Sequence, residues 1–143
     1  MFIGEYKHTI DTKKRLALPA KFRKELGEEV IITKGIENCL VVYTGEEWNV
    51  MSEKLGKLPS GQMEARGFAR LMLSGAMSVN LDKLGRALVP EYLKTYAGLK
   101  KNVVVCGLYN RLELWDEEAW EAYKKKTEKE VGSMAEKLKE LGI

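Results

Sequence analysis

An aspartate and an arginine four positions apart occur twice in the chain, and each pair precedes a short apolar run that ends in proline. The first stretch reads DTKKR then LALP, residues 11–19, and the second reads DKLGR then ALVP, residues 82–90. If the two side chains lie across a tight turn, the carboxylate can hold that turn shut through an ion pair of modest energy. The same carboxylate can also orient the guanidinium, and a fixed arginine fork reads guanine edges or clamps phosphate. Both interpretations hold at once if the ion pair presents the arginine.

Positive charge gathers around these two pairs, although the formal net charge is only +3. Residues 7–24 hold seven basic side chains against one acid, and residues 80–101 hold five against two. Residues 113–143 instead hold nine acids against six lysines. Such an asymmetry can steer an anionic polymer to one face of a protein. The predicted DNA-contacting residues are Asp11, Lys13, Lys14, Arg15, Asp82, Lys83 and Arg86.

The two turns differ in charge. The first carries Lys13 and Lys14 at its tip, where the second has a leucine and a glycine, and basic residues at 21–24 follow the first turn. These lysines would supply phosphate contacts beside the arginine. We therefore expect Arg15 to be the principal DNA contact and Arg86 to be the lesser one, with a more structural part.

Little in the sequence could support catalysis. His8 is the single histidine, so a zinc site or a Ser/His or Cys/His pair has almost nothing to build from. Cys39 and Cys106 stand alone and are expected to be small buried side chains in strands. We expect no enzyme activity, no cofactor and no metal site. No apolar run approaches the roughly eighteen residues of a membrane span, and charges come early at the N-terminus, which favours a cytoplasmic protein.

The two Asp–Arg turns belong to a longer repeat. The offset is 71 residues, and after one extra residue in the second half it becomes 72; the aligned pairs include Asp11 with Asp82, Pro19 with Pro90, Gly27 with Gly98, Gly35 with Gly107, Tyr43 with Trp115 and Trp48 with Trp120. Chance explains a short motif better than it explains a register held over about forty residues. The alignment indicates a tandem duplication.

Each copy predicts the same local elements. Short runs of alternating polarity on either side of the Asp–Arg turn predict half-buried strands. Proline then opens a short helix, at 19–26 or 90–97, which ends at a glycine, and two more strands follow around a turn with glycine and asparagine. One copy is too small to bury a sufficient core, so the copies must pack together, with strands interleaved or side by side.

Longer helices follow each copy. Thr44 begins TGEEW, a capping box in which Glu47 can reach back to the cap, and that helix runs to about Leu58. A second helix is predicted over about 62–73. The C-terminal helix starts at Asp116 and carries apolar or neutral side chains at steps of three and four up to Leu141, which resembles a heptad seam. The seam either packs on its own domain or faces a neighbouring subunit.

The chain closely resembles the MraZ family, a bacterial relative of the AbrB and MazE antitoxin DNA-binding domains. The features that carry the resemblance are the opening MFIGEYKHTID, the doubled DxxxR and the correspondence of Trp48 with Trp120. The resemblance covers nearly the whole chain. It implies a mainly β fold with flanking helices: a pseudo-dimeric double-split β-barrel built from two tandem AbrB-like repeats. The implied units are 1–58 (first repeat with its helix), 59–75 (linker helix) and 76–143 (second repeat with the long C-terminal helix).

The resemblance also implies a function. It points to a nucleoid-associated transcriptional repressor that acts at the promoter of the division and cell-wall gene cluster and binds direct repeats of double-stranded DNA. Family members form closed rings, and a ring would let several loops act together through multivalency. The positions carried over are Asp11, Arg15, Asp82 and Arg86, whereas the lysines come from the charge argument alone. A second hypothesis is a protein-assembly module whose DxxxR loops contact another subunit or a partner.

Overall fold

The same order of strands and helices occurs in both halves of the computed structural model, which describes all residues from 1 to 143. The first half contains β1 (Phe2–Thr9), β2 (Arg15–Ala17), the 3-10 turn η1 (Ala20–Phe22), α1 (Arg23–Leu26), β3 (Glu29–Lys34), β4 (Leu40–Thr44) and α2 (Gly45–Gly56). After α3 (Met63–Ser74), the second half contains β5 (Met77–Asn80), β6 (Arg86–Leu88), α4 (Glu91–Tyr96), β7 (Asn102–Tyr109), β8 (Leu112–Asp116), α5 (Glu117–Lys137) and η2 (Lys139–Leu141). The predicted elements of the duplication are confirmed. None of the helices combines the length and the apolar character that a membrane span requires.

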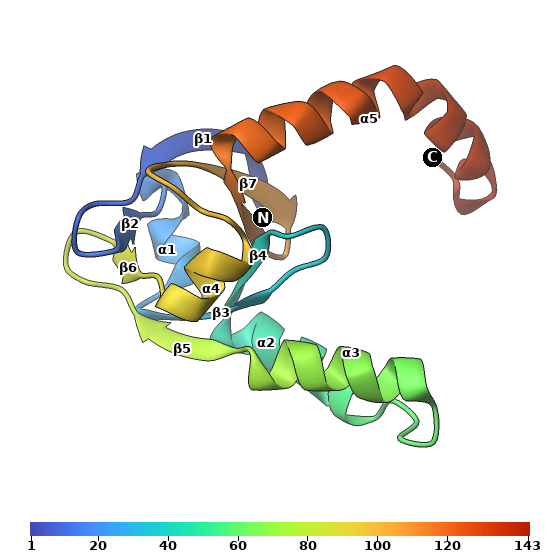
Figure 1. Ribbon diagram of the computed structural model, residues 1–143, viewed down its shortest axis with the longest axis horizontal. Helices are drawn as coiled ribbons and strands as arrows, with labels where there is room; N and C mark the ends of the chain where they lie inside the picture. The colour runs from blue at the N-terminus through green and yellow to red at the C-terminus, as the bar shows by residue number, and fades with distance from the viewer.

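The strand order shows how the halves combine. The large sheet runs β1-β7-β8-β4-β3-β5, and a separate ribbon pairs β2 with β6 (Figure 1). Exchanging the first four strands with the last four reverses the large sheet and leaves its order unchanged, as a pseudo-two-fold axis requires. β1 pairs with β7 and β5 pairs with β3, so each half gives its first strand to the other. The strands are therefore interleaved, and the mainly β, pseudo-dimeric fold with flanking helices is confirmed.

The two halves bury one core. Twenty buried apolar side chains form a single cluster, with ten from residues 2–42 and ten from residues 79–114. Leu16 and Ala87, opposite each other in the β2–β6 ribbon, both face this core. Neither half closes the core alone, which agrees with the size argument. The division into 1–58, 59–75 and 76–143 stays a prediction about repeat boundaries.

The strand register corrects the repeat alignment. Lys34 pairs with Leu40, and Gly107 pairs with Leu112. Leu40 and Leu112 are 72 residues apart, so Lys34 corresponds to Gly107 at an offset of 73. The predicted match of Gly35 with Gly107 is wrong by one residue. A slip of one residue would turn the core-facing side chains of β3 to the opposite face, so burial rather than the shared glycine sets the register.

The caps of the long helices mix local and cross-repeat contacts. Thr44 Oγ1 accepts from the Glu47 backbone N–H at 3.1 Å, so half of the predicted capping box is present. The Glu47 carboxylate does not reach back to the cap and instead accepts from Asn110 Nδ2 at 3.3 Å. Asp116 caps α5 by accepting from the Ala119 N–H at 3.3 Å. The helix predicted to reach Leu58 ends at Gly56.

Only the first turns of α5 pack on the body. Trp120 and Tyr123 lie 5.4 and 5.0 Å from Trp115, ring centre to ring centre. The first half repeats this contact, with Tyr43 and Trp48 at 5.6 Å, as the duplication predicts. Beyond these turns α5 extends away from the sheet (Figure 1), and the apolar seam is solvent-exposed. The interpretation that the whole seam packs on its own domain is therefore wrong.

Both cysteines are buried, as predicted, although Cys39 lies just before β4 rather than inside a strand. Burial raises the pKa of each thiol to about 12. Such thiols stay protonated at neutral pH, and neither forms a disulfide.

The shared core gives a stability prediction. Leu40 is fully buried on β4 and pairs with Leu114 of the other repeat. Leu40→Ala should lower the free energy of unfolding by about 2–5 kcal/mol, because it leaves a cavity where the repeats meet. Denaturant unfolding followed by circular dichroism measures the loss. The control Val50→Ala, on the exposed side of α2, should stay within about 0.5 kcal/mol. Equal effects of the two substitutions would contradict the shared core.

Candidate nucleic-acid interface

The first Asp–Arg loop, which joins β1 to β2, is organised around one carboxylate. Asp11 Oδ1 accepts from the backbone N–H groups of Lys13 and Arg15, both at 2.9 Å. Asp11 Oδ2 accepts from Arg15 Nε at 2.8 Å. The backbone also closes the loop, because the Asp11 N–H donates to the Arg15 carbonyl and the Lys14 N–H donates to the Asp11 carbonyl, both at 3.0 Å. The ion pair that shuts the hairpin is therefore present, as the structural interpretation predicts.

The second loop, between β5 and β6, repeats this arrangement. Asp82 Oδ1 accepts from the N–H groups of Leu84 and Arg86 at 3.0 and 2.9 Å, and Oδ2 accepts from Arg86 Nε at 2.7 Å. Lys14 and Gly85 occupy the same place, with positive φ angles of 63° and 73°. The two loops therefore share one backbone conformation. Its left-handed position is held by a lysine in the first loop and by a glycine in the second.

Both carboxylates have a lowered pKa. For Asp11 the main cause is the Arg15 backbone N–H, followed by the Arg15 guanidinium and the Lys13 N–H. For Asp82 the Arg86 backbone N–H comes first in the same way. The aspartates are thus ionised at neutral pH and can keep their arginines oriented.

The guanidinium groups keep their outer edge free. Each arginine uses Nε toward its aspartate, and neither terminal nitrogen has a hydrogen-bond partner in the protein. The Arg15 and Arg86 side chains are 31% and 27% exposed. An arginine held at Nε presents its two terminal nitrogens in a fixed direction, which suits a guanine edge or a phosphate.

The β2–β6 ribbon joins the two loops. Leu16 pairs with Ala87 and faces the core, whereas Arg15 pairs with Leu88 and Arg86 with Ala17. Side chains alternate along a strand, so both arginines lie on the outward face of one antiparallel ribbon.

The two loops are also bonded to each other's flanking segments, since the Leu18 N–H donates to the Gly85 carbonyl at 3.1 Å and the Val89 N–H donates to the Lys14 carbonyl at 2.9 Å. They lie together at one end of the molecule, and the projecting part of α5 lies at the other (Figure 1).

The predicted lysines differ in their surroundings. Lys13 and Lys83 are exposed on the loops and form no ion pair. Lys14 Nζ lies 2.6 Å from Glu91 Oε2 at the start of α4, so a carboxylate of the second repeat offsets its charge. The structure thus brings all seven predicted residues to one end of the molecule, with Lys14 partly neutralised.

Arg23, in the basic segment at residues 21–24, does not lie where the sequence argument placed it. Arg23 lies against Gly85 of the second loop, so closely that an added Cβ at Gly85 would overlap the Arg23 side chain. Because the repeats exchange strands, the helix after one loop sits beside the other loop. The assumption that this segment supports the first loop is therefore wrong for Arg23, which belongs to the second.

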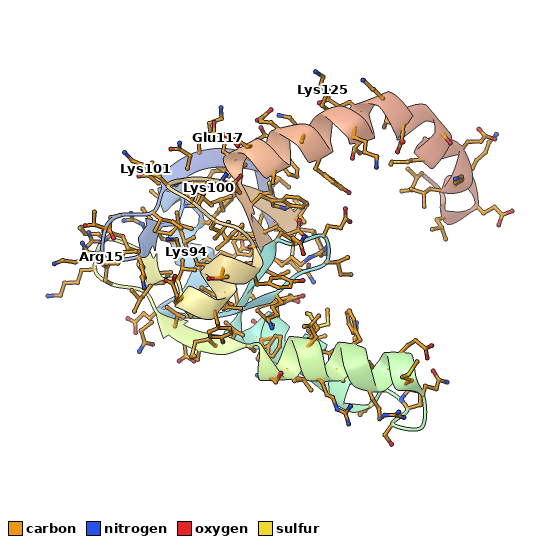
Figure 2. All side chains as sticks on the ribbon, viewed as in Figure 1. Arg15, Lys94, Lys100, Lys101, Glu117 and Lys125 are labelled. Atoms are coloured by element: carbon orange, nitrogen blue, oxygen red, sulfur yellow. The ribbon has the colours of Figure 1, made fainter.

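The first loop has basic neighbours that the sequence argument missed. Lys94, Lys100 and Lys101, all from the second repeat, line an open hollow with residues 9–12. The three lysines are labelled in Figure 2. The KK pair after Gly98 was visible in the sequence, but only the strand exchange places it beside Asp11. Each loop thus has at least one basic side chain of the other repeat beside it.

These features define a class: duplicated, strand-exchanged β proteins that present two aspartate-held arginines on one ribbon. The family described as "MraZ protein, putative antitoxin-like" matches residues 1–71 and again residues 72–140. Proteins named "Transcriptional regulator MraZ" from Clostridium tetani and Clostridium acetobutylicum are each 48% identical over 143 residues, covering both chains fully. The protein of that name from Ligilactobacillus salivarius is 46% identical over 138 residues, 96% of each chain. The chain belongs to the MraZ family.

The lowered pKa values give a pH prediction. Because both carboxyls ionise below their ordinary value of 3.8 when folded, their stabilisation of the loops is complete above about pH 3.8 and is lost as pH falls through the lower folded value. Carboxyl-carbon NMR titration should place both midpoints below 3.8. In Arg15→Ala the two backbone N–H donors to Asp11 remain, so the pKa of Asp11 should rise only part of the way toward 3.8. A midpoint for Asp11 at or above 3.8 in the unsubstituted protein would contradict the loop geometry.

Proposed function

We propose that this chain is a transcriptional regulator that binds promoter DNA through its two Asp–Arg loops. The observation that carries the proposal is the pair of partly exposed guanidinium groups, each held at Nε, on the outward face of one ribbon. The major groove of DNA admits a two-stranded β-ribbon, and arginine reads guanine through paired hydrogen bonds there. The names of the relatives support a role in transcription.

The finer parts of the proposal come from the family resemblance. The regulator would act as a repressor of the division and cell-wall gene cluster, bind direct repeats in its promoter and associate with the nucleoid in the cytoplasm. Arg15 would be the principal contact and Arg86 the lesser one, because the first loop carries Lys13 at a place where the second has Leu84. Arg23 adds a basic side chain beside the second loop, so the two loops differ less in positive charge than their own residues indicate.

The ring-shaped oligomer has its own support. Val131 on α5 and Leu138, the residue that follows α5, are 59% and 41% exposed, and this projecting part of the chain lies far from the loops (Figure 1). A helix that extends from the body with an exposed apolar seam is suited to a contact with another copy of the chain. The alternative, an assembly module that works through the DxxxR loops, would use a different surface, which carries charged side chains together with the exposed Leu84 and Leu88.

Substitution of the arginines tests DNA binding. Arg15→Ala should weaken binding to repeat-containing promoter DNA by about 5-fold to 150-fold, the range for removal of one bidentate base contact, and Arg86→Ala should weaken it less. Arg15→Lys should also fail to restore binding, because lysine keeps the charge but lacks the fork. Fluorescence anisotropy against scrambled DNA measures both effects.

Arg70→Ala, an equal charge change on the exposed surface of α3, is the matched control and should bind normally. Unchanged binding by Arg15→Ala, with a native circular dichroism spectrum, would refute DNA reading by the first loop. Dissociation of the oligomer in Arg15→Ala and Arg86→Ala, with DNA binding kept in the dissociated subunit, would favour the assembly hypothesis.

The seam gives a separate prediction about assembly. Val131→Glu with Leu138→Glu should dissociate the oligomer, because it places two carboxylates in an apolar contact. Native mass spectrometry reads the subunit number. The dissociated protein should keep its affinity for a single repeat and lose most of its advantage on DNA with several repeats. Lys126→Glu, on the same helix, is the control for charge, and an unchanged mass in the double variant would contradict the proposed interface.

A further inference from the structure

We propose that Lys94, Lys100 and Lys101 of the second repeat form a binding site for the DNA phosphate backbone beside the first Asp–Arg loop. The inference rests on the proposed function and adds to it. While the arginine loop of one repeat contacts the bases, lysines of the other repeat would bind the phosphate backbone beside it. The three lysines lie outside the predicted DNA-contacting set.

The site is an open hollow of about 580 Å³. Residues 9–12, the end of β1 and the start of the first loop, line it together with the three lysines. Figure 2 shows Lys94, Lys100 and Lys101 on the same part of the molecule as Arg15. Asp11 also borders the hollow, but both of its oxygens are already engaged by Arg15 and Lys13. The hollow is therefore lined by three lysines and by one carboxylate that is already occupied.

The lysines stand on a fixed part of the backbone. The Ile10 N–H donates to the Lys101 carbonyl at 2.8 Å, which ties the first loop directly to the lysine segment. Leu99 is buried in the shared core, and its N–H donates to the Lys94 carbonyl at 3.0 Å. The distance between Arg15 and these lysines is thus set by the fold. A base-reading arginine and a phosphate site held in fixed relation place the protein in one register on DNA.

The pseudo-two-fold axis shows that the fold does not require a positive charge at the position of Lys101. The Leu81 N–H donates to the Glu28 carbonyl at 2.8 Å, the counterpart of the bond from Ile10 to Lys101. Glu28 therefore stands beside the second loop where Lys101 stands beside the first. The same backbone geometry accepts an acid or a base, so the lysine is explained by what it meets outside the protein rather than by packing.

The ion pairs of the region leave most of its charge available. Lys94 and Lys101 form no ion pair, and Lys100 Nζ lies 3.7 Å from Glu118 Oε2 in an exposed pair of little energy. The acidic start of α5 borders the lysines on the side away from the loop, where Glu117 pairs with Lys7 at 3.3 Å (Figure 2). These acids would repel a polyanion, so the backbone of DNA should approach from the side of the loop. Lysines act as point charges toward phosphate, which matches this position on the flank of the arginine contact.

The test measures how DNA affinity depends on salt. The variant Lys94→Ala, Lys100→Ala, Lys101→Ala should lower the slope of log affinity against log salt by about 0.9 for each phosphate that the protein no longer neutralises, or about 2.7 for three. Raising the salt four-fold should then cost the variant roughly 40-fold less affinity than it costs the unsubstituted protein. Promoter and scrambled DNA should be affected alike, because phosphate carries no sequence. Arg15→Ala should instead reduce the ratio between the two DNAs.

Two single substitutions complete the design. Lys125→Ala, on the exposed face of α5, is the matched control for removal of a positive charge and should leave the slope nearly unchanged. Glu28→Lys places beside the second loop the charge that Lys101 gives to the first, and a steeper slope in this variant supports the assignment. Thermal melts establish that each variant is folded.

The outcomes separate the two proposals. An unchanged slope in the triple variant, with binding that still depends on Arg15, overturns the phosphate site and leaves the proposed function standing. A triple variant that loses only the preference for promoter DNA also overturns it, because the lysines would then read bases. Failure of the unsubstituted protein to bind any DNA overturns the proposed function together with the inference.

Discussion

The exchange of first strands between the two repeats is the constraint on which the rest of the structure depends. β1 pairs with β7 and β5 pairs with β3, so each repeat completes the hydrogen bonding of the other's third strand. Equal numbers of buried side chains from both repeats then form one core. A single repeat would expose a strand edge and half of that core, which a unit this small cannot tolerate. Duplication thus achieves within one chain what a dimer achieves between two.

Strand exchange also decides what surrounds each Asp–Arg loop. Since β1 ends beside the start of β7, the first loop is bonded to Lys101, and the second loop meets Arg23 and Glu28 of the first repeat. The loops themselves are nearly identical in hydrogen bonding. Their electrical environments differ because the crossing segments differ. Two copies of one motif can therefore diverge in function while their internal geometry stays the same.

Local features of the fold could be predicted from the sequence, and cross-repeat contacts could not. Alternating polarity located the strands, and the Asp–Arg spacing predicted the ion pair, because both signals lie within a few residues. The partner of each strand is a non-local choice, so the sequence left interleaved and side-by-side packing open and placed Arg23 beside the wrong loop. Glu47 shows the same limit: a local capping rule gives way to Asn110 of the other repeat. In α5, periodicity revealed an apolar seam but not how far the body covers it.

The division of acceptor atoms explains how an aspartate can stand in a surface suited to a polyanion. In each loop Oδ1 takes two backbone N–H groups and Oδ2 takes the arginine Nε, so each carboxylate oxygen already has a donor and the guanidinium lies against the negative charge. The arginine keeps its outer edge free, and the loop gains its shape from the same contacts.

Lys14 is part of the same arrangement. Its left-handed backbone costs about 1 kcal/mol relative to glycine, a cost that Gly85 avoids in the second loop. The first loop accepts that cost and holds the lysine through Glu91 of the other repeat, so here too a contact between repeats fixes the loop that the sequence motif defines.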